Sequence, residues 1–305
     1  MTSASLTQTL EKQDAPAGRA RPARRFSWAW LGVVPFFAFV TLFLFLPSLS
    51  LFVGSFQDAQ GQFTLANIAG LFTPSILSAY WITIRISAFT AIAGGLFGFF
   101  LAYAGTLSGL PRYVRDGLMT FCGVASNFAG VPLAFAFIAT LGRLGLVTVV
   151  LKQVLGINLY ANGFSLYSFW GLSLTYLYFQ FPLMVLIITP ALEGLRRDWR
   201  EAAENLGATS WQYWRYVGLP ILLPSLLGTM ILLFGNAFGA YATALSLTGG
   251  LINLVTILIG AQIKGDVLHN VGLGYALAFG MVVVMAITMA GYYVLLRRSE
   301  RWLRG

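Results

Sequence analysis

Long apolar stretches separated by short polar segments fill the chain from residue 31 onward. Most of them reach or exceed the about 20 residues with which a helix crosses the roughly 30 Å hydrocarbon core of a bilayer. None of these stretches contains an Asp or Glu. The pattern predicts six membrane-spanning helices, at Leu31–Val53, Ser78–Leu107, Gly117–Leu141, Leu166–Leu192, Leu219–Leu247 and Leu273–Leu296.

Two further segments differ from a span. The apolar run Leu144–Leu155 is short and is interrupted by Lys152 and Gln153, which predicts an interfacial or re-entrant helix. Residues 1–27 are rich in Ala, Pro and Arg and predict a disordered, basic cytoplasmic tail. Residues 28–305 are the predicted transmembrane domain.

The basic residues predict how the spans are oriented. With the N-terminus inside, fifteen of the 19 Lys and Arg residues lie in the tail, in the loops after the second and fourth spans, or at the C-terminus. Such a bias marks the cytoplasmic side of a membrane protein, so both termini are predicted to be cytoplasmic. The four remaining cations are placed at the outer side: Arg85, Arg143, Lys152 and Lys264.

Composition supports an all-α polytopic membrane protein. Hydrophobic residues make up 58% of the chain and charged ones 10%, against roughly 25% charged in a typical globular protein. The net charge of +9 does not indicate a nucleic-acid partner, because 25 Phe and long apolar runs are foreign to basic nucleic-acid binders. A single Cys and a single His cannot form a His/Cys metal site, and no phosphate-binding G-x-x-x-x-G-K-[ST] loop occurs. We therefore predict no cofactor or metal, and any ATP that drives the protein must bind another polypeptide.

The predicted cytoplasmic loop 193–218, with the sequence EGLRRDWREAAENLGATSWQYWRYVG, has a pattern of its own. Asp198 is predicted to cap a first helix, with Glu201 completing an acidic capping box. An apolar stripe follows that helix, and Gly207 is predicted to end it in the left-handed conformation. Thr209 or Ser210 would then cap a second short helix, which carries Trp211, Trp214 and Val217. The stripe consists of Leu195, Trp199, Ala202, Ala203 and Leu206.

Two exposed amphipathic helices on the cytoplasmic face permit two interpretations. One is a docking surface for a protein partner, because exposed aromatics favour aggregation unless they are covered. The other is a pair of helices that lie on the lipid headgroups. The physical pattern alone does not separate them.

A motif in this loop resembles a known family. Glu201-Ala202-Ala203, three residues, Gly207, nine residues, Val217, one residue and Leu219-Pro220 follow the pattern EAA-x3-G-x9-I-x-LP. Only Val217 departs from it, and Val keeps the β-branched apolar side chain of Ile. The pattern is typical of the membrane subunits of binding-protein-dependent ABC importers, and the resemblance extends from about the second span to the C-terminus.

The resemblance implies a type I importer permease in the bacterial cytoplasmic (inner) membrane, without enzymatic activity of its own. In that family the loop docks onto an ATPase subunit, so the resemblance assigns ATPase coupling to Glu201, Ala202, Ala203, Gly207, Val217, Leu219 and Pro220. The implied partners are two ATPase subunits, a second permease subunit of the same or a similar kind, and an extracytoplasmic solute-binding protein. Pro220 is also predicted to restrict Leu219 and to set the angle at which the chain enters the fifth span.

Uncharged polar side chains inside the spans are candidates for a translocation path: Asn127, Gln180, Asn236, Tyr241 and Thr243. Asn236 and Thr243 are seven residues apart and would share one face of a continuous helix. The alternative is that these groups hold helices together, since Gly94-x-x-x-Gly98 and Gly235-x-x-x-Gly239 are close-packing signatures. Mid-span prolines at positions 132 and 182 predict kinks in the third and fourth spans.

The solute is predicted less directly. Residues 238–256 resemble permeases of the polyamine, aminoethylphosphonate and ferric-iron branch, yet acid-free spans attract a polycation poorly. Selectivity would then reside mainly in the solute-binding protein. An ion-coupled secondary transporter is the alternative function, although the lack of acids in the spans counts against it. A membrane enzyme is a third, for which the chain offers no catalytic constellation beside His269.

Overall fold

The computed structural model describes residues 32–107, 109–264 and 270–303, with side chains through residue 297. Within these ranges the chain forms helices and one isolated β-bridge, which confirms the predicted all-α class. The predicted tail at residues 1–27 lies outside the described residues. Six helical segments of the described chain are long and apolar enough to cross a membrane, which is the number predicted: Val34–Ser55, Pro74–Leu107, Val131–Val154, Phe169–Glu193, Ser210–Phe238 and Val271–Arg297. The third segment differs from the predicted span Gly117–Leu141, because it begins at Val131 and includes the short run predicted as a separate interfacial helix.

The first helical segment belongs partly to a compact unit that ends at Leu49, while residues from Ser50 onward form a second unit. Helix α2 (Val34–Val40), a π-helical turn (Thr41–Phe45) and α3 (Leu46–Ser55) follow one another without a break. Residues 34–49 are apolar apart from Thr41 and Ser48, as a helix that faces lipid requires.

Helix α5 (Pro74–Leu107) packs closely against α9 (Phe169–Glu193) and α12 (Leu219–Phe238). A Cβ on Gly94 would lie 2.7 Å from Cβ of Gln180, and one on Gly98 would lie 2.5 Å from Cβ of Met184. Small residues therefore bring the α5 and α9 backbones together, which confirms the close-packing signature in the second span.

Two of the predicted spans are broken. The third consists of α6 (Arg112–Asn127) and α7 (Val131–Leu141), separated by residues 128–130. The fifth consists of α12 and α13 (Tyr241–Thr248), separated by residues 239–240. The prediction of continuous helices over Gly117–Leu141 and Leu219–Leu247 is therefore wrong.

Glycine and proline account for the first break. Gly130 has φ +75°, a left-handed conformation that stops α6 from continuing into α7. Pro132 lies in the first turn of α7, where its missing N–H costs no hydrogen bond, and so it does not kink a continuous span. Pro182 does lie inside α9.

The two breaks are joined by side chains. The backbone N–H of Gly130 donates a hydrogen bond to Oγ1 of Thr243 at 2.8 Å. The hydroxyl of Tyr176, from α9, donates to the carbonyl of Ala240 at 2.9 Å. Irregular backbone at membrane depth requires such partners because lipid offers none. Asn236 and Thr243 lie on separate helices, so the prediction that they share one helical face is wrong.

Replacing Thr243 by Val should destabilise the protein by about 1 kcal/mol, because the half-buried N–H of Gly130 loses its acceptor. Thermal unfolding in detergent, followed by the loss of the monodisperse peak, measures the effect. Thr243→Ser keeps the oxygen and should stay close to the parent. Thr248→Val is the matched control, since Thr248 is equally buried on the same helix but donates only to the Ala244 carbonyl of its own turn. An equal loss in both Val variants would contradict this role.

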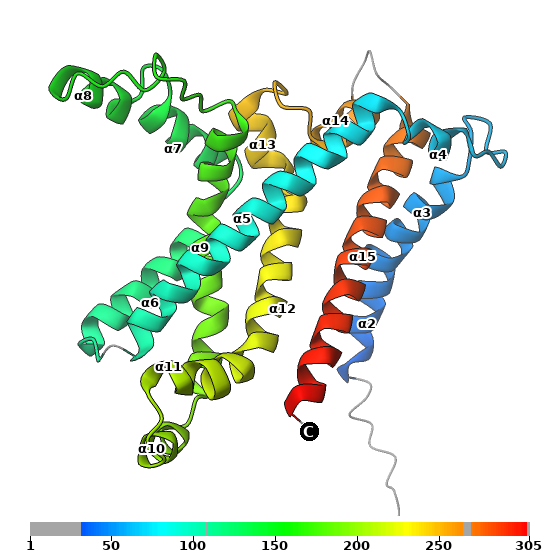
Figure 1. Cartoon of the computed structure of the whole chain (residues 1–305). Coiled ribbons are helices and arrows are strands. Elements are labelled where there is room, and N and C mark those ends of the chain that lie inside the picture. Colours follow the sequence, from blue (N-terminus) through cyan, green and yellow to red (C-terminus); the bar gives the residue numbers. More distant parts are fainter. Residues whose placement is uncertain (1–31, 108, 265–269, 304–305) are drawn as a thin grey trace, which may run out of the picture. The chain divides into compact units, whose positions relative to one another are not determined.

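Shorter helices complete the second unit. A short helix, α8 (Leu146–Val154), lies where an interfacial or re-entrant helix was predicted, and its position in the membrane stays a prediction. Helices α4 (Ala66–Gly70) and α14 (Val255–Lys264) are also short. Figure 1 shows α8, α13 and α14 at the end of the helices opposite α10 (Arg197–Asn205) and α11 (Ser210–Tyr213). The last helix, α15 (Val271–Leu303), packs on α12, where the Tyr292 hydroxyl donates to the Pro224 carbonyl at 3.3 Å.

Candidate functional site: the elbow between α9 and α12

Residues 193–218, here called the elbow, begin with helix α10. Its N-cap is Arg196, whose backbone is extended and whose side chain does not cap. Asp198 lies in the first turn instead, where a carboxylate suits the positive end of the helix dipole, and it binds Arg196 at 2.6 Å. The prediction that Asp198 caps the helix in a capping box with Glu201 is therefore wrong.

The turn after α10 matches the prediction for Gly207. Its φ of +78° is left-handed, its N–H donates to the Glu204 carbonyl at 2.9 Å, and the N–H of Ala208 donates to the Ala203 carbonyl at 3.0 Å. This pair of hydrogen bonds is the Schellman arrangement, which satisfies the last carbonyls of a helix. A Cβ at Gly207 would meet no atom within 4 Å, so the backbone conformation, and not crowding, is what requires glycine.

The second half of the elbow is continuous with the membrane helix α12. Thr209 caps α11 in a capping box with Gln212, which selects Thr209 over Ser210. A π-helical turn, η3 (Trp214–Gly218), then leads into α12 without a break. The predicted separate second helix is wrong, because Ser210–Phe238 form one uninterrupted helical segment.

The π-helical turn explains why Pro220 does not break this segment. The N–H of Leu219 bonds to the carbonyl of Trp214, five residues back, so the helix changes register just before the residue that has no N–H. Leu219 itself is helical, with φ −66° and ψ −44°. The predicted restriction of Leu219 by Pro220 therefore does not take effect, because Leu219 keeps helical backbone angles.

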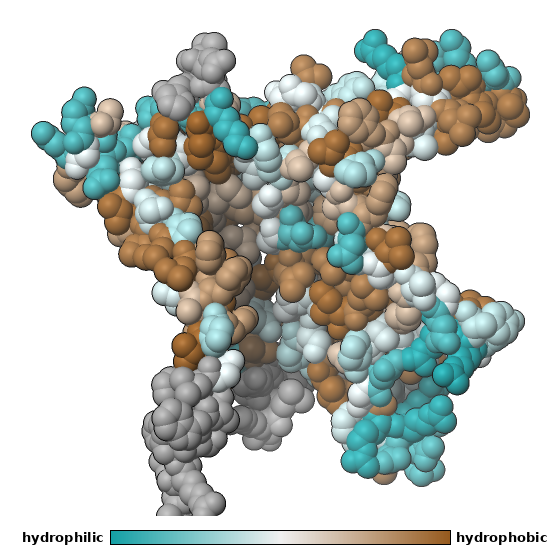
Figure 2. Space-filling model, turned by 180° about the vertical axis from the view of Figure 1, so that it is seen from behind, coloured by the Kyte–Doolittle hydropathy of each residue, from teal (hydrophilic) through white to brown (hydrophobic). Residues whose placement is uncertain are grey.

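The predicted coupling residues lie on an exposed projection. Helix α10 buries no residue: Glu201 and Ala202 are exposed and Ala203 is half-buried. The apolar side chains of Leu206 and Trp211 are 88% and 71% exposed. In Figure 2 hydrophilic residues gather over this end of the molecule, beside the hydrophobic flanks of the helices.

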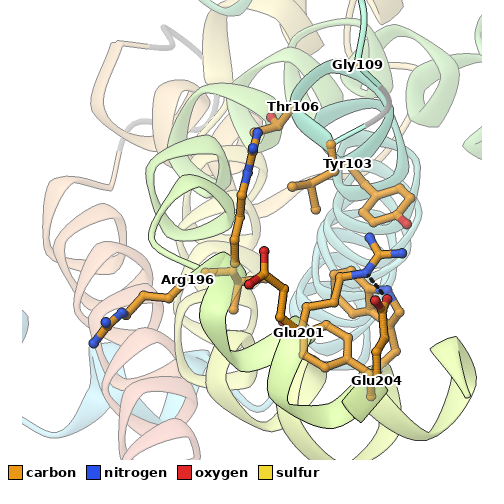
Figure 3. A pocket seen from close by; sticks show the side chains of 12 residues that line it. Tyr103, Thr106, Gly109, Arg196, Glu201 and Glu204 are labelled. Carbon is orange, nitrogen blue, oxygen red and sulfur yellow. Dashed lines mark hydrogen bonds and ion pairs between the residues drawn. The ribbon is translucent and has the colours of Figure 1, made fainter. Parts of the chain in front are cut away.

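A cavity of 450 Å³ separates the elbow from the end of α5. Figure 3 shows the carboxylate of Glu201 directed into this cavity, while the side chain of Arg196 points away from it. Glu204 is held by Arg200 at 2.9 Å. Within the described part of the chain, Glu201 makes no ion pair, so its carboxylate is available to a basic group.

Two contacts that the sequence pattern did not reveal attach the elbow to the membrane helices. The rings of Tyr103, on α5, and Trp214 meet edge to face with centroids 5.2 Å apart. Arg115, on α6, forms an ion pair with Glu193 at the end of α9. Tyr103 and Arg115 lie near the predicted cytoplasmic ends of spans, but no spacing rule pairs them with residues 111 and 78 positions away.

The candidate path residues separate into two groups. Gln180 is fully buried and donates to the Leu233 carbonyl at 2.9 Å, and Thr243 is the buried acceptor between the breaks, so both join helices, and their role as path residues stays a prediction. Asn127 and Asn236 are exposed and Tyr241 is half-buried. Asn127 ends α6 and Tyr241 begins α13, so both lie beside a break, and their role as path residues stays a prediction.

Comparisons with known proteins agree on one family. Residues 94–301 match the family described as "Binding-protein-dependent transport system inner membrane component". The chain is 29% identical over 232 residues to a probable sulfate transport system permease protein cysT of Nephroselmis olivacea, covering 75% of each. It is 30% identical over 218 residues to the sulfate transport system permease protein CysT of Escherichia coli strain K12, covering 70% of this chain and 72% of that protein.

The fold also has a solved counterpart. A crystal structure of a bacterial ABC transporter involved in the import of the acidic polysaccharide alginate superposes with a TM-score of 0.72 at 16% identity. The match covers 88% of this chain and 95% of that one, and at this identity it concerns the fold alone.

Proposed function

Because this chain belongs to the family of binding-protein-dependent transport system inner membrane components and is a permease subunit of an ABC importer, we propose that its elbow receives the work of a separate ATPase. The chain is a multi-pass protein of the inner membrane and a transport subunit, not itself an enzyme. In this proposal Glu201, Ala202, Ala203 and Gly207 form the docking surface. Val217, Leu219 and Pro220 lie in the connection to α12.

The observation that carries this proposal is the uninterrupted helix from Ser210 to Phe238. A displacement of the docked elbow is passed to α12 because no flexible joint lies between them. The Tyr103–Trp214 contact and the Arg115–Glu193 ion pair extend the same connection to α5, α6 and α9. A rigid-body change between inward-open and outward-open states then requires elbow contacts that differ in the two states.

The exposed side chains of the elbow indicate what kind of partner surface it would bind. Leu206 and Trp211 offer apolar area, Glu201 offers a carboxylate, and Ala202 offers a small side chain that lets a partner surface approach closely. This combination of apolar anchors with a charged group suits a protein groove. We assign it to two ATPase subunits, one beneath this chain and one beneath a second permease subunit of the same or a similar kind. A solute-binding protein serves the opposite face.

For the solute we propose a small inorganic oxyanion, with sulfate as the first candidate. The two named relatives are sulfate permeases, so they do not support the polyamine branch predicted from residues 238–256. The predicted spans contain no Asp or Glu, and each break is followed by the N-terminal end of a helix, α7 or α13, whose positive dipole end favours anions.

Reconstitution tests the function. Proteoliposomes that contain this chain, its second permease subunit and its ATPase should take up radiolabelled sulfate only with internal ATP and a loaded binding protein, and a labelled polyamine should not compete. Vesicles with the chain alone and an imposed proton or sodium gradient are the control. Gradient-driven uptake by the chain alone would establish the secondary transporter instead, and ATP-driven uptake of the polyamine would overturn the solute but not the coupling.

A further inference from the structure

A cavity of 630 Å³ lies at the end of the helices opposite the elbow, between the loop after α7, α8 and the segment that leads to α9. Arg143 and Lys152 contribute two cations to its wall, and Gln153 and Asn158 contribute side-chain amides. Residues 142–168 contain no Asp or Glu. Among the described residues neither cation forms an ion pair, so the cavity is electropositive.

A buried hydroxyl also lines this cavity. Thr148 is only 5% exposed, and within the described residues its Oγ1 has no hydrogen-bond partner. A buried hydroxyl without a partner is costly, and an acceptor atom bound in the cavity would remove that cost. Arg143 is held in position by the ring of Tyr160, 5.7 Å below its guanidinium carbon, and the Tyr160 hydroxyl donates to the Leu141 carbonyl at 2.9 Å.

The size and the surroundings of the cavity indicate what occupies it. One water molecule occupies about 30 Å³ in the liquid, and an inorganic oxyanion occupies only a few times that volume. Such an ion would leave most of the 630 Å³ cavity empty. Beside it, the apolar side chains of Leu144 and Val154 are 92% and 73% exposed, and Leu146 is exposed as well. In Figure 2 hydrophobic and hydrophilic residues lie side by side over α7 and α8. An amphipathic helix with cations beside its apolar face is typical of a lipid interface.

We propose that this cavity binds the headgroup phosphate of an anionic phospholipid, with the acyl chains along the exposed apolar face of α8. Arg143 and Lys152 pair with the phosphate, and the Thr148 hydroxyl donates to one of its oxygens. The charge distribution of the chain places this end outside, so the lipid belongs to the outer leaflet. The bound lipid fixes α7 and α8 to the bilayer. Helix α7 begins directly after the first helix break.

The test counts lipids that stay bound to the full chain. The protein is taken from nanodiscs of phosphatidylcholine that contain a minor fraction of phosphatidylglycerol, and native mass spectrometry measures retained phosphatidylglycerol. The double variant Arg143→Gln/Lys152→Gln should bind it roughly 20- to 30-fold more weakly, since it removes the two cations in the cavity wall that pair with the phosphate. Thr148→Val should weaken it by a smaller factor. The matched control, Arg85→Gln/Lys264→Gln, removes the same charge outside the cavity and should bind like the parent.

Each other outcome overturns the proposal. Equal retention by the double variant and the control, in chains that remain monodisperse, would mean that the cavity does not hold the lipid. Equal retention of phosphatidylcholine would mean that no anion is recognised. Displacement of phosphatidylglycerol by millimolar inorganic sulfate or phosphate would assign the cavity to a soluble oxyanion. A double variant that keeps the lipid but no longer binds the solute-binding protein would assign these cations to protein docking.

Discussion

Replacing Gly207 by Arg should lower ATP-driven import about tenfold or more, while the chain still inserts into the membrane. The backbone of Gly207 is left-handed, with φ +78°, a conformation that costs Arg about 1–2 kcal/mol relative to glycine. The position is open, so an Arg side chain would extend from the tip of the elbow, at the surface proposed to dock. Copurification of the ATPase with the permease, together with ATP-dependent uptake, measures the loss.

Two control variants separate the effect of the backbone conformation from the effects of the Arg side chain and of its position. Gly207→Asn should retain most of the import, because Asn tolerates the left-handed conformation and adds no charge. Gly61→Arg introduces the same side chain at a glycine with φ +77° and open surroundings, in the loop before α4, and should import normally. If Gly207→Arg copurifies with its ATPase and imports like the parent, the elbow is not the coupling surface.

The second large effect is expected at Gly98, in the contact between α5 and α9. A Cβ there would lie 2.5 Å from Cβ of Met184 and 2.6 Å from the backbone carbonyl oxygen of Phe181. Because a backbone carbonyl cannot rotate aside, Gly98→Leu must separate the two helices, and we expect a loss of about 3 kcal/mol or more, at the upper end of overpacking effects. The temperature of unfolding in detergent and the yield of monodisperse protein report it.

Gly123 supplies the matched control for this packing argument. It also lies within a helix, α6, but a Cβ there meets nothing within 4 Å. Gly123→Leu should therefore leave the unfolding temperature unchanged or raise it slightly, because a helix gains from losing a glycine. Gly98→Ala should fall between the parent and Gly98→Leu. Equal stability of the two Leu variants would show that the α5–α9 contact adapts and is not fixed by Gly98.

The sequence predicted correctly those features of the helices that depend on residues close together in the chain. Hydrophobic length alone predicts the number of spans, because a bilayer imposes the same requirement on each. Gly207 was predictable because the left-handed conformation strongly favours glycine, and Thr209 because its hydroxyl reaches its own N3 amide. In both cases all the interacting atoms lie within a few residues of one another. The elbow was located by the EAA-type spacing, through its resemblance to the family pattern.

Only the tertiary structure decided where helices break and what the polar span residues do. The break at Gly130 is satisfied by Thr243, which is 113 positions away, and Gln180 bonds to Leu233 across two helices. No local pattern contains such pairs, because a lipid-buried backbone group accepts any partner that the packing brings within reach. The continuity of the elbow with α12 was also not predictable, because the proline at position 220 is typical of a helix boundary. Only the structure shows the π-helical turn that lets the helix continue through it.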